Sequence, residues 1–511
     1  MSGQFAMVVS PAPIVLAGQG GAEAGSADAG GLLAQAAAGP GFWEDLLGEL
    51  RREGLIAELL ADGVITEAVA QAEHGHKLDR ALTAEVTVMC VLAGALFPDQ
   101  GYALVLARTF AMPGLPVKPG TLTPSGPALS KARVLLGEQV MRRIFEIDAA
   151  RAGADPGTGA AWHQMEVTAI DGTTIELFSN DELAEAFGVP TGGTKPKLRI
   201  AAHVRTGSRR WIAAAVGGYL DGENTLADEL EQSFTEGILN TADRGFFSMD
   251  RWIRFSARGA HLAWRVKNGA KSVPFKTIKT LPDGSELVLL RESGSMLGKR
   301  RRESGDKTLP RLPDTVARLV SFTVTTRTAR RVKTSVIKVL TTLLDPQEFP
   351  AVEIAALYAE RWQVETAFLH LKKTVKGTGR TLRGRSVTLA RQEAWALLLI
   401  HNMTATIAAR AAAHAGLDPH LIPFTTVLAL IRGHVTADTC CPHCGKRPAS
   451  GNDPIALLVN QVLAQPAHRD RPARTSGRTA FQRQHWHTEE VKYTIKIVPS
   501  NLPKADINPG S

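Results

Sequence analysis

The chain has 511 residues, of which 44% are hydrophobic and 21% charged, a composition that excludes a largely disordered protein. Its 59 Lys and Arg residues outnumber 50 Asp and Glu residues, and the net charge of +9 favours a polyanionic partner such as nucleic acid. Four cysteines argue against a disulfide framework and fit a reducing cytosol.

The N-terminal third is predicted to be helical after a flexible tail. Residues 1–42 are rich in Gly, Ala and Ser, and Pro11 and Pro13 interrupt their apolar run, so we expect no signal peptide. In 43–150, apolar residues recur at three- and four-residue spacing, which predicts a helical domain. One amphipathic helix should begin near Ser125, with that serine or a neighbour as its cap. Cys90 lies in an apolar run and is expected in the core, and 151–160 form a linker by composition.

A strand pattern follows the linker. Three consecutive strands are predicted, and helices and strands then alternate, an order that suggests an RNase H-like α/β core whose first part is 161–269. Trp252 and Trp264 are expected to pack inside this core. The predicted strands are 165–177, 198–207, 210–220, 237–245 and 261–269.

The alternation stops at 270–345, which we interpret as a β-rich insertion, with the basic run Lys299–Arg302 on one of its loops. This run either contacts phosphates or is the solvated tip of a hairpin. The core should resume at 346–412 with a long helix, followed by a mostly helical C-terminal region, 413–511. The most apolar stretch is broken by His401 and Asn402 well short of the ~20 residues of a membrane span, so no membrane association is expected.

Three acidic residues stand where a catalytic crevice would form. Asp171 ends the first predicted strand and Asp243 the fourth, and strand ends expose side chains to the substrate crevice of an α/β sheet. Glu365 on the long helix could converge on the same edge. Carboxylates are ligands that Mg²⁺ prefers, and two such ions about 3.5–4 Å apart can cleave a phosphodiester. Taken singly, each aspartate also has an ordinary turn explanation.

The segment "YAERWQVETAFLHLKK" (358–373) carries the helical acid. On one continuous helix, Tyr358, Arg361, Glu365 and Lys372 would share an arc of roughly 60°. By itself this stripe is also explained by an ordinary i,i+4 ion pair on a solvated face.

The spacing Tyr358-x2-Arg361-x3-Glu365-x6-Lys372 resembles in full the Y-x2-R-x3-E-x6-K signature of the insertion-sequence-four family of DDE transposases, relatives of the transposon-five transposase. "AIDGTT" and "TADRGFFS" resemble that family's two aspartate motifs, and "LAWRVK" the strand that follows them. The N-terminal helical segment resembles the domain that many members carry, which implies that 43–150 binds DNA. The resemblance covers about 55–410.

The resemblance implies that Asp171, Asp243 and Glu365 bind two Mg²⁺ ions, for which Mn²⁺ can substitute. It also implies that Tyr358, Arg361 and Lys372 contact DNA near the scissile phosphate, Arg as a fork and Lys as a point charge. Further along, a glycine-containing loop carries basic residues that could contact phosphates. Basic side chains that simply face solvent explain this loop equally well. Its basic residues are Arg380, Arg383 and Arg385.

We therefore expect a cytoplasmic, nucleoid-associated bacterial transposase that binds terminal inverted repeats and performs cut-and-paste transposition. Its partners would be double-stranded DNA, both transposon ends and target, and a second copy of the chain on paired ends. Two alternatives stay open. One is a catalytically silent DNA-binding descendant of a transposase, and the other is an RNase H-like nuclease without strand transfer.

A structural zinc site is a separate hypothesis. Cys441 and Cys444 form half of a zinc knuckle beside Cys440 and His443, and no second CxxC pair exists in the chain. A closed tetrahedral site would need histidine ligands, and free thiols are the alternative. The candidate histidines are His434, His443, His485 and His487.

Overall fold

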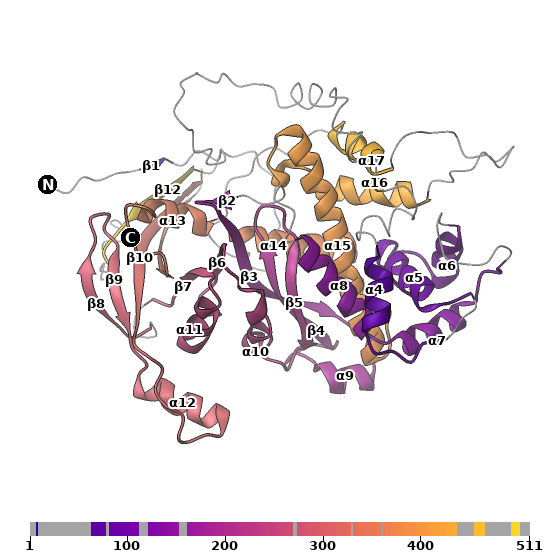
Figure 1. The fold of residues 1–511 in the computed structure, drawn as a ribbon, viewed down its shortest axis with the longest axis horizontal. Helices are drawn as coiled ribbons and strands as arrows, with labels where there is room; N and C mark the ends of the chain where they lie inside the picture. Colours follow the sequence, from indigo (N-terminus) through magenta and orange to yellow (C-terminus); the bar gives the residue numbers. More distant parts are fainter. Residues whose placement is uncertain are drawn as a thin grey trace.

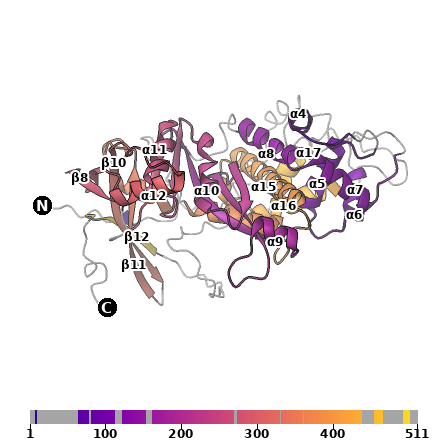
Figure 2. The ribbon, with the colours of Figure 1, turned by 90° about the horizontal axis from the view of Figure 1, so that it is seen from below.

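The computed structural model describes residues 7–8, 63–77, 81–111, 121–152, 161–268, 273–328, 331–359, 361–436, 454–464 and 492–500. One twelve-stranded mixed sheet runs through the molecule (Figure 1). The strands after 270 lie at one end of it, and the N-terminal helices lie at the other (Figure 1, Figure 2).

The centre of the sheet has the strand order β5-β4-β3-β6-β7. The first three strands form an antiparallel meander, and β6 and β7 run parallel to β3, which is the topology of an RNase H-like core. This confirms the five predicted strands and the fold class. Their bounds are β3 Met165–Glu176, β4 Lys197–Arg205, β5 Trp211–Gly218, β6 Ile238–Ala242 and β7 His261–Arg265, and β2 (Ala161–Trp162) pairs with β3.

The β-rich insertion continues the same sheet. β11 pairs antiparallel with β7 and with β10, and β9 pairs with β10 and β8. A strand near the C-terminus, β12 (Lys492–Ile497), also pairs with β10, and β1 (Met7–Val8) pairs with β12. The sequence pattern did not predict β8 or β12. The insertion strands are β8 Phe275–Thr280, β9 Glu286–Leu290, β10 Thr315–Thr328 and β11 Arg331–Thr341.

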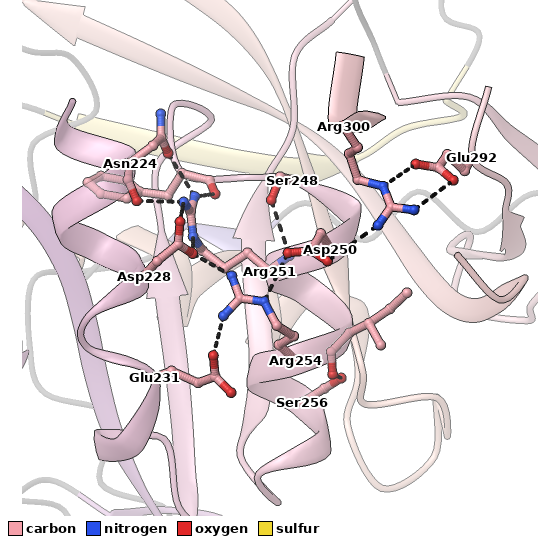
Figure 3. A network of polar contacts seen from close by, with 12 residues as sticks. Asn224, Asp228, Glu231, Ser248, Asp250, Arg251, Arg254, Ser256, Glu292 and Arg300 are labelled. Atoms are coloured by element: carbon pink, nitrogen blue, oxygen red, sulfur yellow. Dashed lines mark hydrogen bonds and ion pairs between the residues drawn. The ribbon is translucent and has the colours of Figure 1, made fainter. Parts of the chain in front are cut away.

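The basic run of the insertion is helical, which corrects the expected loop. Helix α12 (Gly294–Ser304) is capped by Ser293, and its C-cap Gly305 has φ 72°. Arg300 donates to Glu292 Oε1 at 2.6 Å and lies 3.8 Å from Asp250 in the core (Figure 3). The serine cap and the terminal glycine are the signals of a short helix.

Helices cover both faces of the core strands. Ala169 of β3 packs with helices α14 and α15, whereas its neighbour Ile170 packs on the opposite face with α10 and α11. Trp252 and Trp264 are fully buried in that second cluster, which confirms that they are core residues. Bounds are α9 Asp181–Phe187, α10 Glu223–Asp228, α11 Met249–Ala257, α13 Ala351–Ala359, α14 Trp362–Leu369 and α15 Val387–Ala415.

The N-terminal helices pack on α15. Ser125 caps α7 by accepting from the Ala128 N–H, as predicted, but Gly137, with φ 72°, divides the expected single helix into α7 and α8. Cys90 is 2% exposed, and burial raises the pKa of its thiol to about 12, so it is a core residue. The helices are α4 Val64–Gln71, α5 Ala84–Leu96, α6 Tyr102–Phe110, α7 Gly126–Leu136 and α8 Gln139–Ala152.

Helix α15 is long and apolar enough to cross a membrane by length and composition, but 89% of its most apolar window is buried inside the protein. Two of its buried polar residues bind β5: the Trp211 indole donates to His401 Nδ1 at 2.9 Å, and the Trp211 N–H donates to Asn402 Oδ1 at 2.9 Å. It is therefore the central helix of the core. Helices α16 (Phe424–Thr436) and α17 (Pro454–Leu463) pack against it.

A buried ion pair joins the helical domain to the core, and its loss should be costly. Arg210, the residue before β5, donates to Asp148 of α8 at 2.8 Å, and their side chains are 8% and 7% exposed. Asp148→Ala would leave a buried cation unpaired, and we expect a loss of about 3–5 kcal/mol in the free energy of unfolding. Urea denaturation measures it, with Glu146→Ala as the control, because the exposed pairs of Glu146 should contribute at most about 1 kcal/mol. Equal losses would contradict a structural role for the buried pair.

Candidate active site

The segment that carries the four-residue signature is not one continuous helix, which corrects the expected single stripe. Helix α13 ends at Ala359 and α14 begins at Trp362, with the Arg361 N–H donating to the Tyr358 carbonyl at 3.3 Å in between. Residues 370–375 then form a π-helical turn. The break has a packing cause: α13 is buried against the insertion strands, whereas α14 is buried in the cluster that holds α15.

Tyr358 consequently points into the core. Its side chain is 5% exposed, and its hydroxyl donates to the carbonyl of Ala242, the last residue of β6, at 3.4 Å. Burial raises the pKa of Tyr358 to about 12, so the phenol stays protonated and can donate. The residue therefore lies beneath the strand end that carries Asp243.

Arg361 brings two of the predicted acids together. Its Nη1 lies 3.3 Å from Asp171 Oδ2, and its Nη2 lies 3.1 Å from Glu365 Oε1. Asp171 comes from β3 and Glu365 from α14, so one guanidinium connects the strand and helix carboxylates. The Arg361 side chain is 14% exposed, which strengthens these contacts relative to a solvated pair.

Asp171 lies within β3, which continues to Glu176, and this corrects the expectation that Asp171 ends its strand; Asp243 directly follows the end of the neighbouring β6. Ile170 and Ala242 are paired in the parallel ladder of β3 and β6, so Asp171 and Asp243 follow directly after partnered residues. The Asp243 Oδ1 accepts from the Arg244 N–H at 2.7 Å and lies 3.5 Å from Arg265 Nη1. The three acids thus lie around one edge of the sheet.

Lys372 stands on the π-helical turn. Burial lowers its pKa, the nearby Lys373 and Lys197 lower it further, and Asp171 opposes this shift. The Lys372 ammonium therefore lies close enough to the Asp171 carboxylate for the two charges to interact.

The arginine loop lies mainly against the helical domain. Arg380 donates to the Pro98 carbonyl at 2.9 Å, and Arg383 donates to the Gln100 carbonyl at 2.7 Å. Both arginines line a cavity of about 520 Å³ between that domain and the core. Arg385 instead stacks over the Phe178 ring at 4.6 Å and is exposed to solvent.

The acids fit a divalent cation by their chemistry. They supply hard carboxylate oxygens, which Mg²⁺ prefers, and the Arg361 cation already lies between two of them. In this arrangement, the described part of the chain holds no group of three or more His, Cys, Asp or Glu side chains close enough to bind a metal ion. The proposed zinc ligands Cys440, Cys441, His443 and Cys444 lie outside the described residues.

Glu223 is a fourth acid near this edge that sequence reasoning missed. It is the first residue of α10, where acidic residues are common because they favour the positive end of the helix dipole. Only its spatial proximity to Asp171 and Asp243 sets it apart, and no sequence motif indicates that proximity.

The charge of Asp171 should make stability depend on pH. Burial raises its pKa from 3.8 to about 6, against the lowering effect of Arg361. The folded protein therefore holds this proton more tightly than the unfolded chain, so the stability contribution is present below about pH 3.8 and is lost as the pH rises through 6. In EDTA, Asp171→Asn should raise the melting temperature relative to wild type more at pH 7.5 than at pH 4. A gain independent of pH would contradict this.

Comparison with known proteins identifies the family. Residues 162–403 match the family described as the transposase DDE domain, and residues 52–146 match the insertion element 4 transposase N-terminal family. Transposase InsG for insertion sequence element IS4 of Escherichia coli (strain K12) is 27% identical over 399 residues, 77% of this chain and 84% of InsG. InsZ of the same strain is 25% identical over 142 residues, 27% of this chain and 48% of InsZ.

Among solved structures, the piggyBac transposase synaptic complex with hairpin DNA aligns over 83% of this chain and 87% of that chain. The TM-score is 0.38 and the identity 10%. This alignment is too weak to identify a shared fold by itself. The two family matches together cover the helical domain and the core with its insertion, in the order found here. The chain belongs to the insertion-sequence-four family of DDE transposases, which are enzymes that act on DNA.

Proposed function

We propose that this transposase binds the terminal inverted repeats of its element and moves it by cut-and-paste, through metal-dependent phosphodiester cleavage and strand transfer. The observation that carries this proposal is the contact of Arg361 with both Asp171 and Glu365, beside the strand end that bears Asp243. The site residues proposed here are Asp171, Asp243 and Glu365 for metal binding and catalysis, and Tyr358, Arg361 and Lys372 around the scissile phosphate.

DDE transposases generally use divalent metal ions. A bound Mg²⁺ or Mn²⁺ pair would supply charge stabilisation for the attacking and leaving oxygens. The protein's own cations complete the site: Arg361 would exchange its carboxylate partners for a DNA phosphate, which it can bind through two parallel N–H donors. Lys372 would bind the same strand as a point charge. Tyr358 would position the Asp243 strand end rather than contact DNA through an exposed ring.

DNA binding would extend beyond the acids, on transposon ends and target alike, and we propose a homodimer on paired ends in the bacterial cytosol. Arg385 is exposed and is proposed as a phosphate contact. Arg380 and Arg383 donate to backbone carbonyls of the helical domain, so a DNA contact by either would require exchange of those hydrogen bonds for phosphates. A catalytically silent DNA-binding protein is disfavoured because burial of Asp171 beside two other acids would serve no purpose in it.

Glu365→Gln separates catalysis from binding. The change keeps the size of the side chain but removes a carboxylate charge, so cleavage of a transposon-end duplex with Mg²⁺ should fall by more than about 100-fold. Binding of the duplex, measured by gel shift, should be retained. Glu353→Gln on α13 is the matched control, because the Glu353 carboxylate pairs with His163, which is not one of the proposed site residues. If Glu365→Gln cuts as well as wild type, Glu365 is only a surface partner of Arg361 and the proposed chemistry is wrong.

Arg361→Gln tests the competition between the guanidinium and the metal. Without DNA, removal of a positive charge beside two carboxylates should tighten Mn²⁺ binding by about tenfold, measured by calorimetry. Cleavage should nevertheless slow, because a phosphate contact is lost. Arg361→Lys is the control that keeps the charge, and its Mn²⁺ affinity should stay near that of wild type. Weaker Mn²⁺ binding by Arg361→Gln would mean that Arg361 organises the acids rather than competing for them.

A further inference from the structure

We propose that Glu223 is a fourth carboxylate of the metal-binding pocket and contributes to divalent-cation binding there. The inference rests on the proposed function and adds a residue to it. Asp171, Asp243 and Glu365 were identified from sequence motifs that resemble those of the family. Glu223 is identified only from the structure, in which α10 packs close to β3.

The evidence begins at Gly172, the residue after Asp171. A Cβ at this position would lie 1.9 Å from Glu223 Oε1, 2.6 Å from its Cδ and 2.8 Å from its Cγ. Any side chain at 172 would displace the Glu223 carboxylate, so the absence of a side chain lets that carboxylate lie directly on the strand. The Gly172 N–H also donates to Asp171 Oδ1 at 2.8 Å. Both carboxylates therefore lie against the same residue.

The two carboxylates reach Gly172 from opposite faces of the sheet. Asp171 points to the face covered by α14, where Arg361 binds it, and Gly172 faces α10, because successive residues of a strand alternate. The ladder between β3 and β6 ends at Ile170 and Ala242. Beyond that point no β6 residue pairs with Gly172, so the acids on the two faces adjoin the same gap. The charges agree: besides burial, Glu223 raises the pKa of Asp171, and Asp243 raises the pKa of Glu223.

The backbone next to Glu223 is held firmly. Buried Arg251 donates to both the carbonyl and the side-chain oxygen of Asn224 at 2.7 Å, and to Asp228 at 2.9 Å (Figure 3). Yet within the described residues the Glu223 carboxylate has no hydrogen bond or ion pair; Arg199 acts on it only through its charge. A half-buried acid held near two others, without a partner, is unfavourable unless a cation binds among them.

Calorimetric titration of the full chain with Mn²⁺, without DNA, tests the proposal. Glu223→Gln should weaken Mn²⁺ binding by about 10–100-fold, the usual effect of losing a carboxylate that supports a metal site. Glu229→Gln is the matched control, because Glu229 is exposed at the end of the same helix. If wild type binds Mn²⁺ and Glu223→Gln binds it equally well, the role of Glu223 is refuted. If wild type binds none, the proposed metal site itself fails.

A double-mutant cycle checks the geometry. Gly172→Ala should displace Glu223 and weaken Mn²⁺ binding as Glu223→Ala does. The double variant should bind no more weakly than Glu223→Ala alone, because the three nearest atoms around an added Cβ all belong to Glu223. Additive losses would show that Gly172 acts independently and would overturn this arrangement. If Gly172→Ala does not fold, the comparison of Glu223→Gln with Glu229→Gln still decides.

Discussion

The contact between Arg361 and the carboxylates of Asp171 and Glu365 is the interaction on which the site depends. Acids from a strand and from a helix repel one another when they converge, and the repulsion grows as water is excluded. A cation between them reduces this penalty. The guanidinium provides it in the protein alone, and in the proposed mechanism a metal ion together with a DNA phosphate would replace it.

The fold brings the acids together by ending one strand early. β6 stops at Ala242, while β3 continues to Glu176, so the edge beside Asp171 is open. The two faces of the sheet are covered by different helices, and each delivers an acid to that opening: Glu365 from α14 and Glu223 from α10. Tyr358 donates a hydrogen bond to the Ala242 carbonyl, which ties the end of β6 to α13, the helix before α14.

Local pattern was enough to predict much of this fold. The five core strands were predicted in their order along the chain, and the signature from Tyr358 to Lys372 pointed to the transposase family that the comparisons identify. What failed depends on long-range packing. The expected single helix breaks at Arg361 because its two halves enter different hydrophobic clusters. β12 pairs with β10 across more than 150 residues of chain, which no local pattern reveals. Glu223 likewise becomes meaningful only when α10 lies on Gly172.

The loop arginines also show what cannot be predicted from sequence alone. Arg380 and Arg383 lie in a loop whose composition is typical of phosphate binding. In the protein without DNA, however, they donate to backbone carbonyls of the helical domain. A guanidinium satisfies a carbonyl or a phosphate with the same N–H groups, so sequence alone cannot distinguish a domain contact from a DNA contact. The acids differ, because carboxylates that converge from β3, α14 and the end of β6 repel one another, and Arg361 offsets this cost only in part. The acids are therefore a stronger basis for the proposed catalytic role than the loop arginines are.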